Sequence, residues 1–415
     1  MIQTLFLRSL PLAAVALFAT SVSAQKLCNV RHYGAKGDGV TKDTAAIQRA
    51  IDECSGGGGT VVLDGGSVFV SAPLTLHSHM TLSIAAGTTL AGSVDHVDYP
   101  DKEEFKDRGK QALLTATNAE DITIRGEGTI DGRGESWWPA PAEPRPRLIV
   151  FDHSRHIAME GVTVENSPMW QIVPYYSDDI VIRNIRVLAP YPSPNTDAID
   201  PFSSSNIVID HVYADTGDDH IAIKSGEINS PGPDAPSKNI TITDCTFDHG
   251  HGLSIGSEIA GGAQNIHAER IHFKGSDQGI RIKANRDRGN DVSNISYKDI
   301  TMEDVKTAIL ITGYYPHAAP EGAVPAEPVG RLTPFFHDIL IENMTATGSG
   351  TAGTIVGLPE SPVLGLTMKN VHIASKTGMS IAYATVAMDD VVVTPVTGDA
   401  MKIAPTAKVT VTVKK

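Results

Sequence analysis

The sequence predicts an all-β fold, a single-stranded right-handed parallel β-helix with a helical cap at its N-terminal end. A short phrase of alternating apolar and polar residues recurs from about residue 120 onward, and a second apolar pair follows within each repeat. Strict alternation is typical of strands with one buried face. Helical periodicity is almost absent between these strands, so each repeat is interpreted as one coil of a solenoid.

The first strand of each coil begins with a polar residue and continues with apolar positions that alternate with polar ones. These phrases start at Asp121, His156, Asp179, Asn206, Asn239, Asn265, Asn294 and Asp338. The starts from His156 to Asn294 are separated by 23, 27, 33, 26 and 29 residues, which fits one coil per repeat. We expect the Asn and Asp side chains at these starts to stack as a structural ladder.

A second apolar pair marks another strand in each coil. The pairs are Ile221 and Ile223, Leu253 and Ile255, Ile280 and Ile282, and Ile309 and Ile311. We therefore expect two or three short strands per coil, each paired with the equivalent strand of the neighbouring coils.

Two segments lie outside the repeat, and they are predicted to form a cap at one end of the solenoid and a loop on its surface. Asp43 is a candidate N-cap for a helix that runs to about Cys54, with Ile47 and Ile51 on its apolar face. An open solenoid end exposes strand edges, so we interpret this helix as the N-terminal lid. The Pro- and Ala-rich stretch from Pro316 to Pro334 interrupts the repeat and predicts a long surface loop of the kind that shapes binding clefts.

The N-terminus has the pattern of a secretory signal. Arg8 precedes an apolar stretch from Leu10 to Ala19, and small residues lead to a cleavage site after Ala24. We expect residues 1–24 to be a signal peptide, residues 25–415 to form one β-helix domain, and the product to be secreted to the periplasm or the medium. No later stretch is apolar enough for a transmembrane helix, so no membrane partner is expected.

The three cysteines and the net charge restrict the class of protein. Cys28 and Cys54 can pair across the N-terminal cap of an exported protein, which leaves Cys245 as a buried inert thiol. A formal net charge of −14 makes nucleic acid an unsuitable partner. An acidic polysaccharide is repelled by the same average field, so binding one requires a local basic island.

The strongest indication of a catalytic site is a column of polar residues, most of them acidic, on successive coils. When the apolar pairs are aligned, Asp197, Asp219 and His251 occupy equivalent positions on three successive coils, with Asp218 beside them. Crowded carboxylates cannot all ionise cheaply, so at least one pKa is raised. Glycoside hydrolysis needs this combination of a protonated general acid and an ionised carboxylate. A calcium site or a solvated turn is the alternative, although a histidine is a poor ligand for calcium.

The required basic island lies one coil further on. Arg281, Lys283, Arg286 and Arg288 stand against Asp287 alone, and the first two alternate with apolar residues and so face away from the core. Arginine grips a carboxylate bidentately and lysine supplies a point charge, so this pair predicts recognition of a uronic acid. Ion pairing with the protein's own acids is the alternative, and it is weaker for the aligned pair than for Arg286 and Arg288.

At these residues the chain resembles glycoside hydrolase family 28, the polygalacturonases, and its bacterial members in particular. Four short motifs occur in the family's order, and two N-terminal segments are also similar. They are Asn195-Thr196-Asp197, Gly217-Asp218-Asp219, Gly250-His251-Gly252, Arg281-Ile282-Lys283, the phrase from Tyr33 to Gly39, and the segment from Asp131 to Trp138. The resemblance covers nearly all of the chain after residue 24.

The resemblance implies a pectin-lyase-like solenoid and an inverting hydrolase of homogalacturonan without a metal or organic cofactor. Asp218 would be the general acid, Asp197 and Asp219 would activate the attacking water, and His251 would support the acid. The expected substrate-binding residues are Asn195, Arg281, Lys283 and either Tyr314 or Tyr315. Pectin oligosaccharides are the expected partners, and we expect a monomer.

The chain departs from the family's pattern at Ala198, where many members have glycine, and in its few cysteines. A small shift of loop geometry is expected there and no change of chemistry. Three other functions remain to be separated: a calcium-dependent pectate lyase, a hydrolase of rhamnogalacturonan, and a non-catalytic carbohydrate-binding β-helix.

Overall fold

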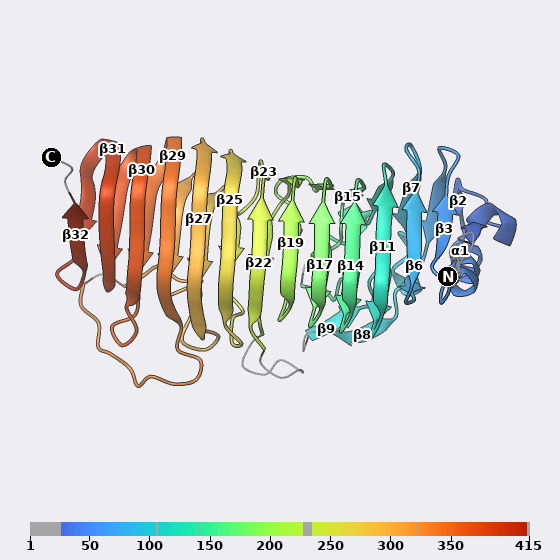
Figure 1. Cartoon of the computed structure of the whole chain (residues 1–415), viewed down its shortest axis with the longest axis horizontal. Helices are drawn as coiled ribbons and strands as arrows, with labels where there is room; N and C mark the ends of the chain where they lie inside the picture. Colours follow the sequence, from blue (N-terminus) through green and yellow to red (C-terminus); the bar gives the residue numbers. More distant parts are fainter. Residues whose placement is uncertain (1–25, 105–106, 141, 227–234, 321, 413–415) are drawn as a thin grey trace, which may run out of the picture.

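A computed structural model describes residues 26–104, 107–140, 142–226, 235–320 and 322–412. The strands stack side by side along an elongated molecule, with the two chain ends at opposite ends of the stack (Figure 1). The expected signal peptide lies outside the described residues, and it stays a prediction. None of the helices within these ranges is long and apolar enough to cross a bilayer.

The strands form three parallel faces, which confirms the expected parallel β-helix. The first face, which carries the site, contains β5 (Leu74–Leu76), β10 (Leu114–Thr117), β13 (Ile149–Asp152), β16 (Ile172–Tyr175), β21 (Ile221–Ile223), β24 (Leu253–Ile255), β26 (Gln278–Lys283) and β28 (Thr307–Thr312). An isolated bridge at Ile199 joins β16 to β21 and completes this face.

The second face contains the strands in which the polar phrases from Asp121 to Asn239 occur, together with three earlier strands that continue the same face. These are β1 (Leu27–Asn29), β3 (Gly59–Leu63), β6 (Met80–Ile84), β11 (Glu120–Gly126), β14 (Arg155–Glu160), β17 (Asp178–Arg183), β19 (Ser205–Asp210) and β22 (Ser237–Thr243). The third face contains β2 (Asp38–Lys42), β4 (Val68–Ser71), β7 (Thr89–Gly92), β12 (Thr129–Asp131), β15 (Thr163–Glu165), β18 (Arg186–Leu188), β20 (Tyr213–Asp215) and β23 (Thr246–Phe247).

Longer strands toward the C-terminus run through two or three faces without interruption. They are β25 (Ala263–Lys274), β27 (Asp291–Glu303), β29 (Phe335–Val356), β30 (Val363–Ala382) and β31 (Ala384–Ile403), and β32 (Lys408–Thr412) ends the stack. The pairing of β22, β25 and β27 keeps one register, so that Ile240, Ile266 and Ile295 lie in one buried column. Stacked aliphatic side chains of this kind form the core.

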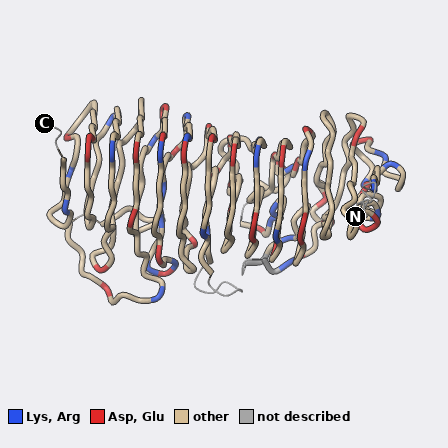
Figure 2. Tube along the Cα trace, viewed as in Figure 1, with Lys and Arg blue, Asp and Glu red and all other residues tan. Residues whose placement is uncertain are grey.

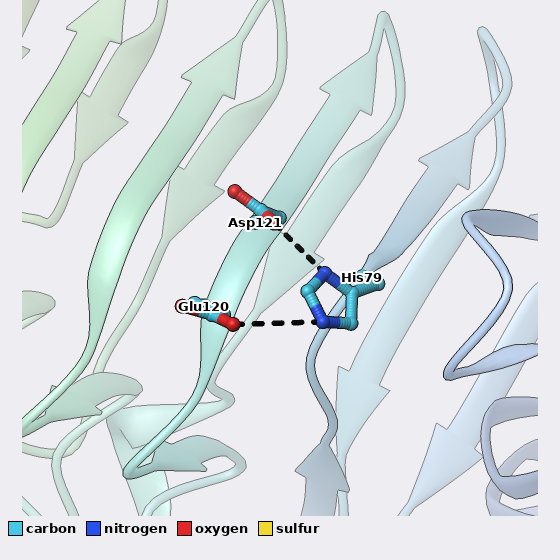
Figure 3. Close-up of side chains that lie close together, drawn as sticks. All are labelled: His79, Glu120 and Asp121. Atoms are coloured by element: carbon cyan, nitrogen blue, oxygen red, sulfur yellow. Dashed lines mark hydrogen bonds and ion pairs between the residues drawn. The ribbon is translucent and has the colours of Figure 1, made fainter.

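Polar side chains stack on the outside of the second face, as the sequence predicted. Asn239 donates to Asn206 at 2.9 Å, Asn265 donates to Asn239 at 3.0 Å, and Asn294 donates to Asn265 at 2.8 Å. Each of these residues has a φ near +55°, a backbone conformation that asparagine tolerates better than most residues. In the N-terminal coils, His79 takes the same position and contacts Asp121 at 2.8 Å (Figure 3).

The N-terminal lid has the predicted bounds but a different capping contact. Helix α1 spans Thr44–Cys54, and its apolar face is buried on the first coil. Asp43 precedes the helix, but its carboxylate accepts hydrogen bonds from the backbone of Lys36 and Gly37 at 2.7 and 2.9 Å and not from the helix. The expectation of a side-chain N-cap at Asp43 is therefore wrong, because this carboxylate is taken by the preceding turn.

The disulfide expected in the cap is present, since Cys28 and Cys54 are bonded, and Cys245 is a buried free thiol. Three short 3-10 helices interrupt the connections: η1 (Val30–Tyr33), η2 (His96–Asp98) and η3 (Gly134–Ser136).

Two irregular segments protrude from the same side of the solenoid (Figure 1). One is the antiparallel hairpin of β8 (Asp101–Glu104) and β9 (Asp107–Lys110). The other is the connection between β28 and β29, in which the described residues form no strand, as the Pro-rich sequence predicted. Acidic and basic residues occur along the whole length of the stack (Figure 2).

Candidate active site

The candidate residues come from the turns that lead into the first face. Asp197 lies two residues before the bridge at Ile199, Asp218 and Asp219 precede β21, and His251 precedes β24. The register pairs Ile221 with Leu253 and Leu253 with Ile280, so the alignment made from the sequence is correct. Successive coils therefore bring these side chains to one place.

Close backbone packing fixes the turns that carry the aspartates. A Cβ on Gly217 would lie 2.2 Å from the carbonyl oxygen of Ser193, so only glycine fits there. The N–H of Gly217 donates to Oγ1 of Thr196 at 3.0 Å. Gly250 has a φ of +140°, and a Cβ there would lie 2.6 Å from the carbonyl oxygen of Asp218. The two short motifs around Asp197 and Asp218 are thus held against each other.

Asp219 is a buried and fully occupied carboxylate. Its Oδ1 accepts hydrogen bonds from Arg281 at 2.8 Å and Ser254 at 2.7 Å, and its Oδ2 accepts one from Lys283 at 2.8 Å. Burial by itself raises the pKa of Asp219, but the ammonium of Lys283 and the guanidinium of Arg281 outweigh it and hold this pKa below its ordinary value. Asp219 is therefore ionised and a weak base.

Asp218 is more exposed and is joined to His251. Oδ1 of Asp218 lies 2.9 Å from Nδ1 of His251 and also accepts the backbone N–H of Asp219 at 2.9 Å. Burial alone lowers the pKa of His251, but the hydrogen bond with Asp218 and the negative charges of Asp218 and Asp219 together outweigh it and raise this pKa above 6.5. Both interactions fall on Oδ1 and leave Oδ2 as the oxygen that can carry a transferable proton.

Asp197 is buried and only partly occupied. Its Oδ2 lies 3.6 Å from Nζ of Lys224, whereas its Oδ1 has no hydrogen-bond partner in the protein. Burial and the neighbouring charge of Asp218 raise the pKa of Asp197 well above 3.8, while Lys224 opposes them. Of the two carboxyls expected to activate water, Asp197 is thus the one with an unoccupied oxygen and the stronger basicity.

Each of the four cations of the basic island forms an ion pair with an acidic side chain of the protein. Arg286 contacts Glu360 at 2.6 Å and Arg288 contacts Asp287 at 2.9 Å, as the sequence alternative suggested. Ion pairing also extends to Arg281 and Lys283, for which the sequence disfavoured it. The reason is that both side chains alternate with core residues, face the turn of the preceding coils, and reach Asp219 there.

The two candidate tyrosines differ in their surroundings. The ring of Tyr315 lies 5.4 Å from the guanidinium of Arg281 and 5.0 Å from Nζ of Lys283. Tyr314 is only 9% exposed and packs against Val356 and Leu358. The structure therefore separates the pair, because Tyr315 borders the charged site and Tyr314 belongs to a neighbouring hydrophobic cluster.

Asn195 begins the turn that carries Asp197, and its position is fixed by a buried arginine. Oδ1 of Asn195 accepts a hydrogen bond from Arg145 at 2.6 Å, and the other terminal nitrogen of Arg145 donates to the carbonyl oxygens of Pro168 and Pro194 at 2.8 Å each. Asn195 adopts a φ of 56°. Arg145 thus ties three segments together at one wall of the site.

Comparison with known proteins places this arrangement in a family. The sequence model of glycosyl hydrolases family 28 matches residues 64–409. The chain belongs to glycosyl hydrolase family 28. The resemblance inferred from the motifs is thereby confirmed, and the chain is a glycoside hydrolase.

Similar family 28 proteins have been named from plants and bacteria. The chain is 34% identical over 368 residues to the "Probable polygalacturonase" of Vitis vinifera, covering 83% of this chain and 74% of that one. It is 31% identical to the endo-polygalacturonase of Pectobacterium carotovorum, covering 91% and 97%. The solved exopolygalacturonase of Thermotoga maritima has a TM-score of 0.80 at 27% identity, covering 89% and 92%, which agrees with the expected right-handed β-helix.

Several buried or partly buried residues around the site of this family 28 chain did not emerge from the sequence. They are Arg145, Trp170, Asp200, Lys224 and Glu258. Lys224 follows the apolar pair of β21 on the outward side of the strand, so alternation could have placed it beside the site. The other four lie in segments without a repeated pattern, and no local signal marks them.

The cluster of Asp218, Asp219 and His251 has three possible ligand atoms within 4.8 Å of one another. Its donor set is unfavourable for calcium, because Asp219 already contacts two cations and the histidine nitrogen is a poor ligand for a hard ion. The positive charges near these carboxylates come from the chain's own side chains.

Proposed function

We propose that this chain hydrolyses the α-1,4-galacturonosyl bonds of homogalacturonan with Asp218 as the general acid. The observation that carries the proposal is the difference between the three aspartates. Asp219 is held ionised by two cations, Asp197 keeps one oxygen unoccupied, and Asp218 is joined to His251 at the more exposed position. Carboxyls with different environments are what glycoside hydrolysis requires.

The proposed reaction moves two protons and exchanges one bond for another. Asp218 gives its proton to the glycosidic oxygen as the bond to the anomeric carbon breaks. Water forms the new bond to that carbon and passes a proton to Asp197. Asp219 is fixed by Arg281 and Lys283, and it orders the water and stabilises positive charge on the sugar ring.

Recognition of a uronic acid is assigned to Arg281, Lys283 and Tyr315, with a further contact from Asn195. Nε of Arg281 is buried and has no hydrogen-bond partner in the protein, so it can donate to a substrate carboxylate only after the groups that cover it move aside. A buried unpaired donor is costly in the free enzyme, and a ligand carboxylate relieves that cost. Polygalacturonate satisfies this requirement better than a neutral polymer.

The stereochemical outcome is proposed to be inversion. One oxygen of Asp218 and one of Asp219 come within 4.8 Å, which is closer than the about 6.5–9.5 Å expected between acid and base in inverting enzymes. Inversion then depends on Asp197 as the base, because it acts from the preceding coil.

The experiment is incubation of the purified protein with de-esterified polygalacturonate. Reducing ends should appear without near-ultraviolet absorbance, and chelator should leave the rate unchanged. Early NMR spectra of an α-linked substrate should show the β-product first. An unsaturated product or loss of activity with chelator would instead support a pectate lyase, and an unchanged polymer would support a binding protein.

The same incubation addresses two finer points. Product lengths over time distinguish internal from terminal cleavage, and a parallel incubation with rhamnogalacturonan distinguishes the backbone that is preferred. Export with cleavage after Ala24 is also proposed, and N-terminal sequencing of the protein recovered from the medium or the periplasm checks it. Sedimentation of the same material checks the expected monomer.

A further inference from the structure

The floor of the site contains a buried lysine that the proposed mechanism does not yet use. Lys224 follows β21, and its side chain is 5% exposed. Its Nζ lies 3.3 Å from Oε2 of Glu258, 3.6 Å from Oδ2 of Asp197, and 4.7 Å from the centre of the Trp170 ring. A buried ammonium is stable only with such compensation.

The backbone of Lys224 is fixed on both sides. Its N–H donates to the carbonyl oxygen of Pro201 at 2.8 Å, and its carbonyl oxygen accepts from the N–H of Ser203 at 2.9 Å and from Oγ of Ser237 at 2.6 Å. Together with Trp170 and Glu258, these contacts restrict where the ammonium can lie. The ammonium is thereby held next to Asp197.

We propose that Lys224 is a positioning residue that anchors Oδ2 of Asp197, so that Oδ1 faces the attacking water as the general base. The inference rests on the proposed function and goes beyond it, because Lys224 contacts the base and not the sugar. The contrast with Asp219 supports it: both oxygens of Asp219 are occupied, whereas one oxygen of Asp197 is held and the other has no partner.

The charges around Asp197 explain why a cation is needed there. Burial and the carboxylates of Asp218 and Asp219 raise the pKa of Asp197, and Lys224 and Lys283 lower it. Asp200, a buried carboxyl whose two oxygens have no partner, also faces Lys224. Burial and the charge of Asp197 raise the pKa of Asp200, and Lys224 opposes them. Without Lys224, Asp197 would hold its proton and could not accept one from water.

The first test is kinetic. Lys224→Met should lower kcat by about 10²-fold with little change in KM, since loss of a positioned base costs about 10²–10⁴-fold and substrate contacts are untouched. The acidic limb of its pH profile should move to higher pH, because Asp197 then ionises at higher pH. Lys224→Arg should recover much of kcat and restore the limb. Lys298→Met, at an exposed lysine paired with Glu342, is the matched control.

Folding must be separated from positioning. Lys224→Met leaves the partly buried Glu258 without its cation, so the double variant Lys224→Met/Glu258→Gln is made as well. The double variant should melt closer to wild type than the single one and should still be impaired in kcat. A double variant with wild-type kcat and pH profile would overturn the proposal.

The second test needs no substrate. Aspartate labelled with ¹³C at the carboxyl carbon is introduced, and the Asp197 resonance is assigned by its loss in Asp197→Asn. In the double variant this carboxyl should titrate at higher pH than in the wild type, and in Lys224→Arg it should titrate as in the wild type. An unchanged titration in the double variant contradicts the inference. Failure of the proposed function would appear separately, as wild-type protein that leaves polygalacturonate intact.

Discussion

At the scale of single residues, three aspartates of one site differ because different cations reach them. Asp219 accepts hydrogen bonds from Arg281 and Lys283, Asp197 is ion-paired with Lys224, and Asp218 is joined to a histidine. The environment therefore assigns the roles, since the three side chains are chemically identical.

The role of Asp218 as general acid predicts a large catalytic loss on removal of its proton. Asp218→Asn should lower kcat by about 10²–10⁴-fold while oligogalacturonate still binds, because an amide of the same shape cannot protonate the leaving group. Kinetics and isothermal titration measure the two effects. Asp299→Asn, outside the site, is the control. A loss below about tenfold would count against the assignment.

The cations at Asp219 predict an effect on both recognition and chemistry. Lys283→Met should raise KM for polygalacturonate by roughly 10- to 100-fold, the worth of a charged contact of about 1.5–3 kcal/mol. It should also lower kcat, because Lys283 helps to hold Asp219 ionised. Arg281→Lys should also be impaired, since the point charge of a lysine cannot replace the planar guanidinium of an arginine.

The comparison that isolates recognition uses polygalacturonate and its fully methyl-esterified form. The wild type should prefer the free acid strongly, and Lys283→Met should lose much of this preference. If the variant keeps the wild-type ratio between the two substrates, the cations serve only Asp219 and the reason for choosing a uronic acid polymer is removed.

At the scale of elements, the turns between strands carry the information that fixes the coils. The asparagine ladder occupies a left-handed backbone position in coil after coil and links neighbouring coils through side-chain amides. Between β20 and β21 the turn carries the candidate residues Asp218 and Asp219. They are followed by His220, which is buried and stacked on Phe247 at 4.8 Å between ring centres.

His220 predicts a loss of stability in acid. Burial lowers its pKa from 6.5 to about 4. In the unfolded chain this histidine is protonated near pH 6.5, whereas in the folded chain it is protonated only near pH 4. Its contribution to the free energy of unfolding is therefore complete above pH 6.5 and decreases as the pH falls from 6.5 to 4. The difference of about 2.5 units corresponds to about 3 kcal/mol.

Denaturant unfolding of wild type and His220→Gln across this pH range checks the prediction. The variant starts from lower stability at pH 7, because the hydrogen bond from Nε2 to the His249 carbonyl and the stacking are changed. Its further decline toward pH 4 should be shallower than that of the wild type. Parallel curves for the two proteins would show that His220 does not titrate as expected.

At the scale of the whole molecule, the solenoid separates the cap from the site. Helix α1 and its disulfide lie at the N-terminal end of the stack (Figure 1), whereas the candidate residues extend from Asn195 to Tyr315. Each coil contacts mainly its neighbours in such an architecture, so damage to the cap should spread only through intermediate coils.

The disulfide of the cap predicts an effect on stability without an effect on catalysis. Cys28→Ser/Cys54→Ser opens a link across 26 residues, which should cost about 3 kcal/mol of unfolding free energy. Thermal melts should show the loss, and kcat and KM well below the transition should equal those of the wild type. Reductant should destabilise the wild type and leave the double variant unaffected. Altered kinetics at low temperature would mean that the cap and the site are coupled.

The sequence by itself determined the coils, the lid and the acidic column. Alternation of apolar residues is a local property, and once Ile221, Leu253 and Ile280 are aligned, the positions of Asp219 and His251 on neighbouring coils follow. The sequence left open whether Cys28 and Cys54 pair, and the structure shows that they are bonded.

Only the tertiary structure decided which charges meet. Arg281 and Lys283 reach Asp219 across 62 and 64 residues of chain. Alternation gives the side of the strand on which Lys224 lies, but not that its ammonium lies between Asp197 and Glu258. Tyr315 was separated from Tyr314 in the same way, by what each ring contacts. The physical reason is that ion pairing and pKa depend on distance and burial across coils, whereas periodicity records only which side of a strand is buried.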